Sequence, residues 1–201
     1  DQKNYDVWLL ALDASGTRIY SKVYGGSQKD VAYSMVVSPK GELVIAGYST
    51  STDGDVSGNK GDQDYWVLNV SAGGKLMWQR NFGGTKADYA STIINDKDGG
   101  FLVGGISYSS DGDISNANGE GDFWVLKISE NGEPQSNTAI GGTGNDNLHS
   151  MVFNQPSGEY YVTGDSDSDD GDLDFGEGQT DIAVFKYKLI DSVIVDSLVC
   201  D

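Results

Sequence analysis

The stretch Asp64–Leu68 (DYWVL) decides the fold of this chain, because it recurs at a fixed spacing. The same pattern begins earlier at Asp6 (DVWLL) and later at Asp122 (DFWVL), and the two steps in residue number are equal. A fourth, diverged copy, Asp181–Phe185 (DIAVF), begins just past the position that the same step predicts. A constant period of about 58 residues indicates an array of supersecondary units, each of which buries its apolar face only against a neighbouring unit.

Other landmarks keep the same period. Three glycine pairs, which begin at Gly25, Gly83 and Gly141, are separated by the same step. Each pair is followed after four or five residues by an aspartate, namely Asp30, Asp88 and Asp146. These aspartates could line a central channel, but we expect them instead to close the turn that follows the glycine pair.

Each unit contains four short apolar runs of the kind that form β-strands. In the middle of the chain they are Leu76–Phe82, Tyr89–Asn95, Phe101–Ser107 and Phe123–Ser129. They are rich in Val, Ile, Tyr, Phe and Trp, and turn-forming residues bound them, which is typical of strands. No window of ten or more residues has helical periodicity.

Four antiparallel strands repeated at a constant period predict an all-β fold, a β-propeller built of four-stranded antiparallel blades. The expected units are a half blade at about 5–25, full blades at about 30–82 and 88–140, and a further blade at about 146–199 whose last strand is Ser192–Val199. We expect the repeated tryptophans, Trp8, Trp66 and Trp124, to be buried between blades. The alternative is a sugar-stacking platform.

The repeat resembles the long-period β-propeller repeats of secreted and surface proteins in Bacteroidetes-type bacteria, with a kelch-like blade layout. The matching pattern consists of Asp64–Val70, Trp78, Gly83–Gly84, Asp88–Ile93 and Asp98–Gly104. The resemblance covers roughly residues 5–188, and the last unit departs from it, with Ser136 at the position of Trp78 and Ala183 at that of Trp124. It implies the fold and an extracellular or bacterial outer-membrane surface location, and it says little about activity.

About three and a half blades do not complete a ring, because typical propellers have four to eight. Open strand edges and apolar blade surface favour pairing with other chains. We therefore expect the edge near Asp6–Tyr24 to be paired by the C-terminal segment, by chain beyond this sequence, or by another protein chain.

Composition excludes several classes of partner. The chain has 31 acidic and 13 basic residues and a net charge of −18, which repels nucleic acid and anionic membranes and suits cations. No apolar run is long enough for a transmembrane helix, so no direct membrane insertion is expected. The single cysteine, Cys200, allows no internal disulfide and does not identify the compartment. No signal peptide is recognisable, and a processed N-terminus is compatible with a chain that begins inside a repeat.

Three acidic loops between the second and third strands carry the most chemical signal. Each has twelve residues with oxygen-bearing side chains at positions 1, 3, 5 and 12, similar to an EF-hand calcium loop, although no helices flank it and position 12 is Asp rather than Glu. The alternative is an acidic turn with a purely structural role. The candidate Ca²⁺ ligands are Asp53, Asp55, Ser57, Asn59 and Asp64; Asp111, Asp113, Ser115 and Asp122; and Asp170, Asp172, Asp174 and Asp181.

The sequence indicates no catalytic residues. It has one histidine, His149, and it lacks a Ser/His/Asp set, a histidine metal cluster and a phosphate-binding loop. The first hypothesis is a non-catalytic extracellular or cell-surface scaffold for binding or assembly; the alternative is a polysaccharide-acting enzyme with its site on one propeller face. The acidic loops and glycine-pair turns fall on the same face, so a glycan or protein ligand is expected there. Four tyrosines near strand ends could form a solvent-exposed rim: Tyr33, Tyr48, Tyr89 and Tyr108.

Overall fold

The computed structural model describes residues 5–173 and 180–187. Within them the strands pair antiparallel, and the one other regular element is a three-residue 3-10 turn, η1 (Gly171–Leu173). This confirms the expected all-β class. The same residues contain no helix with the length and apolar character needed to cross a membrane. The expected last strand, Ser192–Val199, lies outside the described residues.

The described strands form four antiparallel sheets, numbered here in chain order. The first sheet has two strands, β1 (Val7–Leu12) and β2 (Arg18–Tyr24). The second has four, β3 (Asp30–Val37), β4 (Leu43–Ser49), β5 (Asp64–Val70) and β6 (Leu76–Phe82). The third has β7 (Asp88–Asn95), β8 (Phe101–Ser107), β9 (Asp122–Ile128) and β10 (Pro134–Ile140). The fourth has β11 (Asp146–Asn154), β12 (Glu159–Ser166) and β13 (Asp181–Tyr187).

Strand register repeats from sheet to sheet. A glycine on the second strand lies opposite the repeated tryptophan on the third, as Gly47 opposite Trp66 and Gly105 opposite Trp124. The first strand of each of the last three sheets has a bulge at the same place. A Cβ on Gly47 or Gly105 would collide with a carbonyl oxygen of this bulged strand, so the close approach of the two backbones requires glycine. The residues at the bulge are Tyr33, Ser91 and His149.

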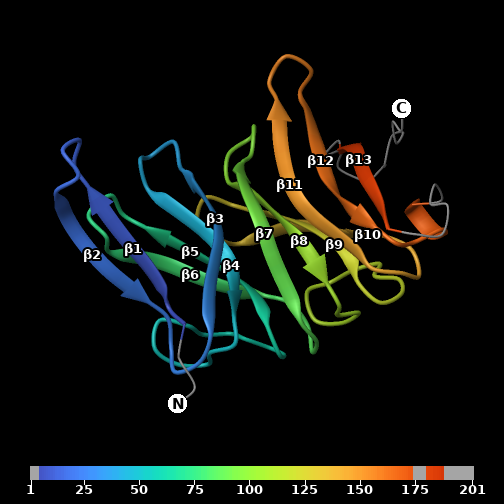
Figure 1. Cartoon of the computed structure of the whole chain (residues 1–201), viewed down its shortest axis with the longest axis horizontal. Helices are drawn as coiled ribbons and strands as arrows, with labels where there is room; N and C mark the ends of the chain where they lie inside the picture. The colour runs from blue at the N-terminus through green and yellow to red at the C-terminus, as the bar shows by residue number, and fades with distance from the viewer. Residues whose placement is uncertain (1–4, 174–179, 188–201) are drawn as a thin grey trace.

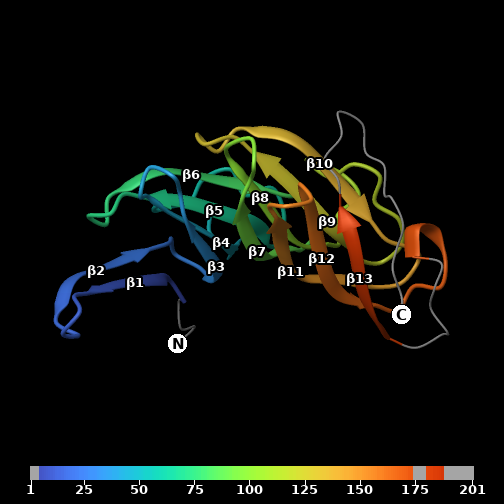
Figure 2. The ribbon, with the colours of Figure 1, turned by 90° about the horizontal axis from the view of Figure 1, so that it is seen from above.

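The sheets stack face to face in a curved row, from β1 and β2 at one end to β12 and β13 at the other (Figures 1 and 2). The face of a sheet that points to the next sheet along the chain is called its front face, and the opposite face its back face. Trp66, on the back of the second sheet, packs with Val7 and Tyr24 of the first. Trp124, on the back of the third sheet, packs on Tyr65, with ring centroids 4.4 Å apart. The cores therefore lie between sheets.

The expectation that all three repeated tryptophans are buried is wrong for Trp8. Trp66 and Trp124 are 0% exposed, but Trp8 is 65% exposed and donates only a side-chain hydrogen bond to Ser21 Oγ (2.8 Å). The physical reason is position in the row. Trp8 lies on the back face of the first sheet, and no earlier sheet covers it in the described part of the chain.

Replacing the same repeat position in two sheets tests this packing. We expect Trp124→Ala to lower the free energy of unfolding by about 3–5 kcal/mol, because it removes a fully buried aromatic side chain. Trp8→Ala should change it by about 0.5 kcal/mol or less, as is usual for exposed positions. Urea unfolding followed by far-UV circular dichroism measures both, and equal losses would contradict the proposed order of the sheets.

Candidate functional site

The best-defined polar cluster lies at each junction between sheets, where a buried aspartate closes the glycine-pair turn. Asp30 Oδ2 accepts hydrogen bonds from the Gly26 N–H (2.7 Å) and from Ser51 Oγ (2.9 Å). Its Oδ1 accepts a hydrogen bond from Ser49 Oγ. A carboxylate this deeply buried is stable only with such a set of donors.

The same network recurs at the next two junctions. Asp88 accepts from the Gly84 N–H (2.9 Å) and from Ser109 Oγ (2.9 Å), and also from Ser107 Oγ. Asp146 accepts from Gly142 N–H (3.0 Å), Ser168 Oγ (3.0 Å) and Ser166 Oγ. The turn-closing role expected for Asp30, Asp88 and Asp146 is therefore confirmed.

The first aspartate of each acidic loop also binds the glycine-pair turn. Asp53 Oδ1 accepts from the Ser27 N–H (2.7 Å), Asp111 Oδ1 from the Thr85 N–H (2.8 Å), and Asp170 Oδ1 from the Thr143 N–H (2.7 Å). In each case the donor is the residue directly after the glycine pair. Loop position 1 is therefore used to hold the loop against the junction.

The third loop position contacts the same turn from the other side. The carboxylates of Asp55 and Asp113 accept from the first glycine N–H, at 3.3 Å from Gly25 and 3.1 Å from Gly83. The backbone N–H groups of Asp55, Asp113 and Asp172 donate to the carbonyl oxygens of Gly25, Gly83 and Gly141, at 2.9, 3.0 and 3.0 Å. Positions 1 and 3 thus have a structural function in all three loops.

The candidate ligands at the other loop positions do not contact the glycine-pair turn in the way that positions 1 and 3 do. Ser57 Oγ accepts from Gln79 Nε2 (2.6 Å), and Ser115 Oγ donates to Asn137 Oδ1 (3.0 Å), so both bind the fourth strand of their sheet. Asn59 Nδ2 donates to the Ser49 carbonyl oxygen (3.0 Å). Asp181 is exposed, and Asp174 lies outside the described residues.

The last loop position differs from all the others. Asp64 is fully buried, and its Oδ2 accepts from the Lys60 N–H (2.6 Å); Asp122 is 2% exposed, and its Oδ2 accepts from the Asn118 N–H (2.8 Å). The Oδ1 atom of each carboxyl group is buried and has no hydrogen-bond partner among the described residues. These two oxygen atoms are the strongest sign of a missing proton or cation partner at the junctions.

Burial raises the pKa of both carboxyl groups. The pKa of Asp64 rises from 3.8 to about 6, because desolvation outweighs the hydrogen bond from Lys60 and because Asp88 and Asp113 are like charges nearby. The pKa of Asp122 also rises to about 6, again chiefly through desolvation, with the carboxylates of Asp146 and Asp172 adding to it. Each junction therefore collects three carboxyl groups from three different strands or loops.

Metal binding at these loops stays a prediction. In residues 5–173 and 180–187, no three Asp, Glu, His or Cys side chains form a group that could hold a metal ion. The geometry gives loop positions 1 and 3 to the glycine-pair turn, and Asp64 and Asp122 each keep one buried oxygen without a partner among the described residues. A cation would therefore approach Asp64 and Asp122 rather than the centre of a twelve-residue calcium loop.

The four tyrosines named from the sequence form one row. Tyr48 lies between Tyr33 and Tyr89, with ring centroids 6.0 and 5.0 Å apart, and Tyr89 is 6.3 Å from Tyr108. Tyr33 is well exposed, Tyr89 and Tyr108 are half-buried and Tyr48 is buried, so the row faces solvent chiefly at Tyr33. Lys29 Nζ lies 5.2 Å from the centre of the Tyr48 ring.

The bulged position of the first strands is a feature that the sequence did not reveal. It carries Tyr33, Ser91 and His149 in successive sheets, so the repeat is not symmetric at this position. Ser91 Oγ is used internally, in a hydrogen bond to the Leu148 carbonyl oxygen. His149 is exposed and pairs through Nε2 with Asp165. The repeat alignment equates these three residues, but nothing in it predicts the bulge.

Comparisons with known proteins bear on the fold alone. No family model and no curated protein matches the sequence. A crystal structure of a protein of unknown function from Bacteroides caccae is similar, with a TM-score of 0.53 and 14% sequence identity. The match covers 94% of this chain and 52% of that one, so the chain spans about half the length of the structure it resembles.

The raised pKa values of Asp64 and Asp122 predict how the stability of the folded chain depends on pH. In the absence of divalent cations, the free energy of unfolding should increase as the pH falls from 7 to 5, because folded Asp64 and Asp122 hold protons that the unfolded chain releases. This stabilisation is complete below the unfolded pKa of 3.8 and is lost as the pH rises through about 6.

Urea unfolding at pH 5 and pH 7 with a chelator present measures this dependence. The double variant Asp64→Asn/Asp122→Asn should be less sensitive to pH than the unmodified chain, because neither site then titrates. Acidification also reduces the net charge of −18, so Asp62→Asn, an exposed aspartate of the same loop, is the matched control. An equal pH response in the double variant would show that the two carboxyl groups are not protonated on folding.

Proposed function

We propose that this chain is, or is part of, a non-catalytic extracellular or cell-surface β-propeller that acts as a scaffold for binding or assembly. The observation that carries the proposal is that successive sheets use equivalent residues for packing and for the junction network. Asp30, Asp88 and Asp146 make the same contacts, and the cores between sheets are built from the same positions. Repetition of this kind supports a structural array rather than one specialised site.

The two ends of the row support assembly. The back face of the first sheet exposes Trp8, Ile19 and Val23, and the front face of the fourth sheet exposes Ile182 and Val184. Within the row these positions are covered: Phe123, at the repeat position of Ile182, is 0% exposed, whereas Ile182 is 80% exposed. Uncovered apolar sheet faces of this kind are typical of interaction surfaces.

The curvature of the row (Figure 2) makes a closed ring the natural completion of this stacking. A front face of one chain would then cover the back face of another chain or of a further unit. The acidic loops and glycine-pair turns, which lie together at every junction, are the face on which we propose a glycan or protein ligand. The strongly acidic charge argues against nucleic acid as that ligand.

A polysaccharide-acting enzyme is the second candidate, and one observation favours it. The exposed His149 pairs with the half-buried Asp165 at the bulge of the fourth sheet, and the equivalents of His149 in the earlier sheets are Tyr33 and Ser91. A residue pair that is present in one unit and absent from the others is what a catalytic site would require. Loss of glycan hydrolysis on His149→Ala, with unchanged stability, would favour this candidate over the scaffold.

Self-association tests the scaffold proposal. We expect the 201-residue chain to associate in sedimentation velocity experiments as its concentration rises. Ile182→Asp and Trp8→Asp should each prevent this, because a buried unpaired charge at either end of the row opposes packing. Met77→Asp, which replaces an exposed apolar residue of β6, is the control and should have no effect. A monomer at all concentrations would contradict assembly through these faces.

Cation binding is the other part of the proposal. Calcium or a similar ion that neutralises the carboxyl groups around Asp64 and Asp122 would stabilise the folded chain by mass action. Saturating Ca²⁺ should raise the melting temperature by roughly 5–10 °C relative to chelator, on the scale of about 2–4 °C per kcal/mol for a chain of this size. The gain should shrink in Asp64→Asn and persist in Asp62→Asn. An unchanged midpoint would leave these loops as acidic turns.

A further inference from the structure

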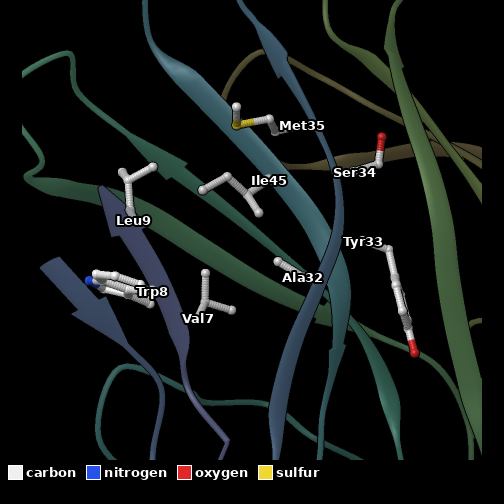
Figure 3. A pocket seen from close by; sticks show the side chains of 8 residues that line it. All are labelled: Val7, Trp8, Leu9, Ala32, Tyr33, Ser34, Met35 and Ile45. Carbon is white, nitrogen blue, oxygen red and sulfur yellow. The ribbon is translucent and has the colours of Figure 1, made fainter. Parts of the chain in front are cut away.

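A groove runs along the free edge of β1. On one side it is formed by β1, and on the other by β3 and β4 of the second sheet (Figure 3). Its lining is mainly apolar, and it consists of Val7, Trp8, Leu9, Ala32, Tyr33, Ser34, Met35 and Ile45. The first sheet contains only β1 and β2 in the described chain, so the edge of β1 that borders the groove has no neighbouring strand there.

The same place is filled in the next two repeats by the second strand of a sheet. The strand equivalent to β1 in the second sheet is β5, and its corresponding edge pairs with β4 from Leu43 to Ser49. In the third sheet β9 pairs in the same way with β8, from Phe101 to Ser107. In two sheets, therefore, the position that is open beside β1 is occupied by a second strand, β4 or β8.

The exposure of the groove floor agrees with this comparison. Met35 is 59% exposed, but its equivalents on β7 and β11, Ile93 and Met151, are 2% and 3% exposed. Ile93 is covered by the apolar cluster that includes Val44 and Ala46 of β4. Met35 is thus the one residue of its series that no second strand covers within the described residues.

The first strand of a sheet also packs against the first strand of the preceding sheet. On β7, the Ile93 N–H donates to Ser34 Oγ (3.3 Å), and Asn95 Nδ2 donates to the Val37 carbonyl oxygen (3.0 Å). Both acceptors belong to β3, the first strand of the preceding sheet. A complete cover for β3 itself would therefore be a hairpin made of the first and second strands of a unit.

We propose that this groove binds a β-hairpin of the repeat's own type, whose second strand adds to the free edge of β1. The inference rests on the proposed function and specifies the partner at one of its surfaces. Main-chain hydrogen bonds along β1 would supply affinity, and alternate side chains in the groove would supply specificity, as in other cases of β-strand addition.

The equivalent positions define the sequence that the groove selects. The residue opposite Trp8 should be glycine, since Gly47 and Gly105 lie opposite Trp66 and Trp124. The residue before it should be small, as Ala46 and Gly104 are in β4 and β8.

The floor of the groove favours a small residue here. A Cβ on Gly104 would already lie 2.9 Å from Met151 Cε and 3.0 Å from Leu148 Cδ2. Met35 and Ala32 stand at the repeat positions of Met151 and Leu148. A large side chain at this point of the incoming strand would therefore have to displace the Met35 side chain.

A second folded copy of the chain cannot supply such a strand from its described residues. Its second strands, β4, β8 and β12, are each paired on both edges. We therefore assign the hairpin to another protein chain that carries the same repeat. This separates the groove from the end-to-end contact of sheet faces, which needs no free strand.

The test uses a synthetic peptide of residues 88–107, which contains the sequences of β7 and β8. We expect this peptide, with a fluorophore at its N-terminus, to bind the 201-residue chain with 1:1 stoichiometry in fluorescence anisotropy. Met35→Glu in the chain and Gly104→Leu in the peptide should each weaken binding at least tenfold. Met77→Glu on β6 is the matched control and should bind as the unmodified chain does, with circular dichroism confirming that both variants fold.

Two further measurements distinguish binding at the groove from other effects. Amide hydrogen exchange of Val7–Leu12 should slow when the peptide is bound, because the free edge of β1 becomes hydrogen-bonded. Ile182→Asp, which is expected to prevent self-association, should leave peptide binding unchanged. Absence of binding, or equal binding by the Gly104→Leu peptide, would overturn the inference, while loss of self-association alone in Ile182→Asp would leave it standing.

Discussion

The arrangement of the whole row depends on one buried carboxylate at each junction between sheets. Asp88 is fully buried, and it accepts hydrogen bonds from the glycine-pair turn, from Ser107 at the end of β8 and from Ser109 just after it. A carboxylate left without these donors would cost several kcal/mol, so the turn and the strand end are held together whenever the sheet folds. That contact sets where one sheet starts relative to the previous one, and so which residues meet in the core between them.

Asp64 lies beside Asp88 and has fewer hydrogen-bond donors. Asp88 has a donor for each oxygen, whereas Asp64 keeps one buried oxygen without a protein partner and a pKa near 6. Burial raises the pKa of both carboxyl groups, but the hydrogen bonds to Asp88 offset more of its desolvation than the one donor to Asp64 does. A proton or a cation at Asp64 would remove that cost. Stability of the array is therefore linked to the pH and cations around it.

The constant repeat period predicted strand positions well, because strand length, alternation and turn residues are local properties. It also identified the role of Asp30, because an aspartate only a few residues after a glycine pair can accept a hydrogen bond from the N–H groups of that turn. Three features depended on tertiary contacts that spacing cannot reveal. Whether Trp8 is covered depends on a preceding sheet; whether Asp53 faces a metal depends on how its loop meets a turn from the previous unit. The bulge at Tyr33 arises where the backbone of β3 meets Gly47.

In an array of this kind, stability is approximately the sum of what each unit contributes and what each interface between units contributes. An internal sheet such as the third gains from two interfaces, whereas the first sheet gains from one and leaves Trp8 and Met35 in solvent. Any partner that covers these residues adds an interface of the same kind as those within the row. Partner binding and folding then draw on one source of free energy, the burial of repeated apolar positions. For a scaffold this linkage is useful, because a sheet at the end of the row becomes as stable as an internal one only in the assembled state.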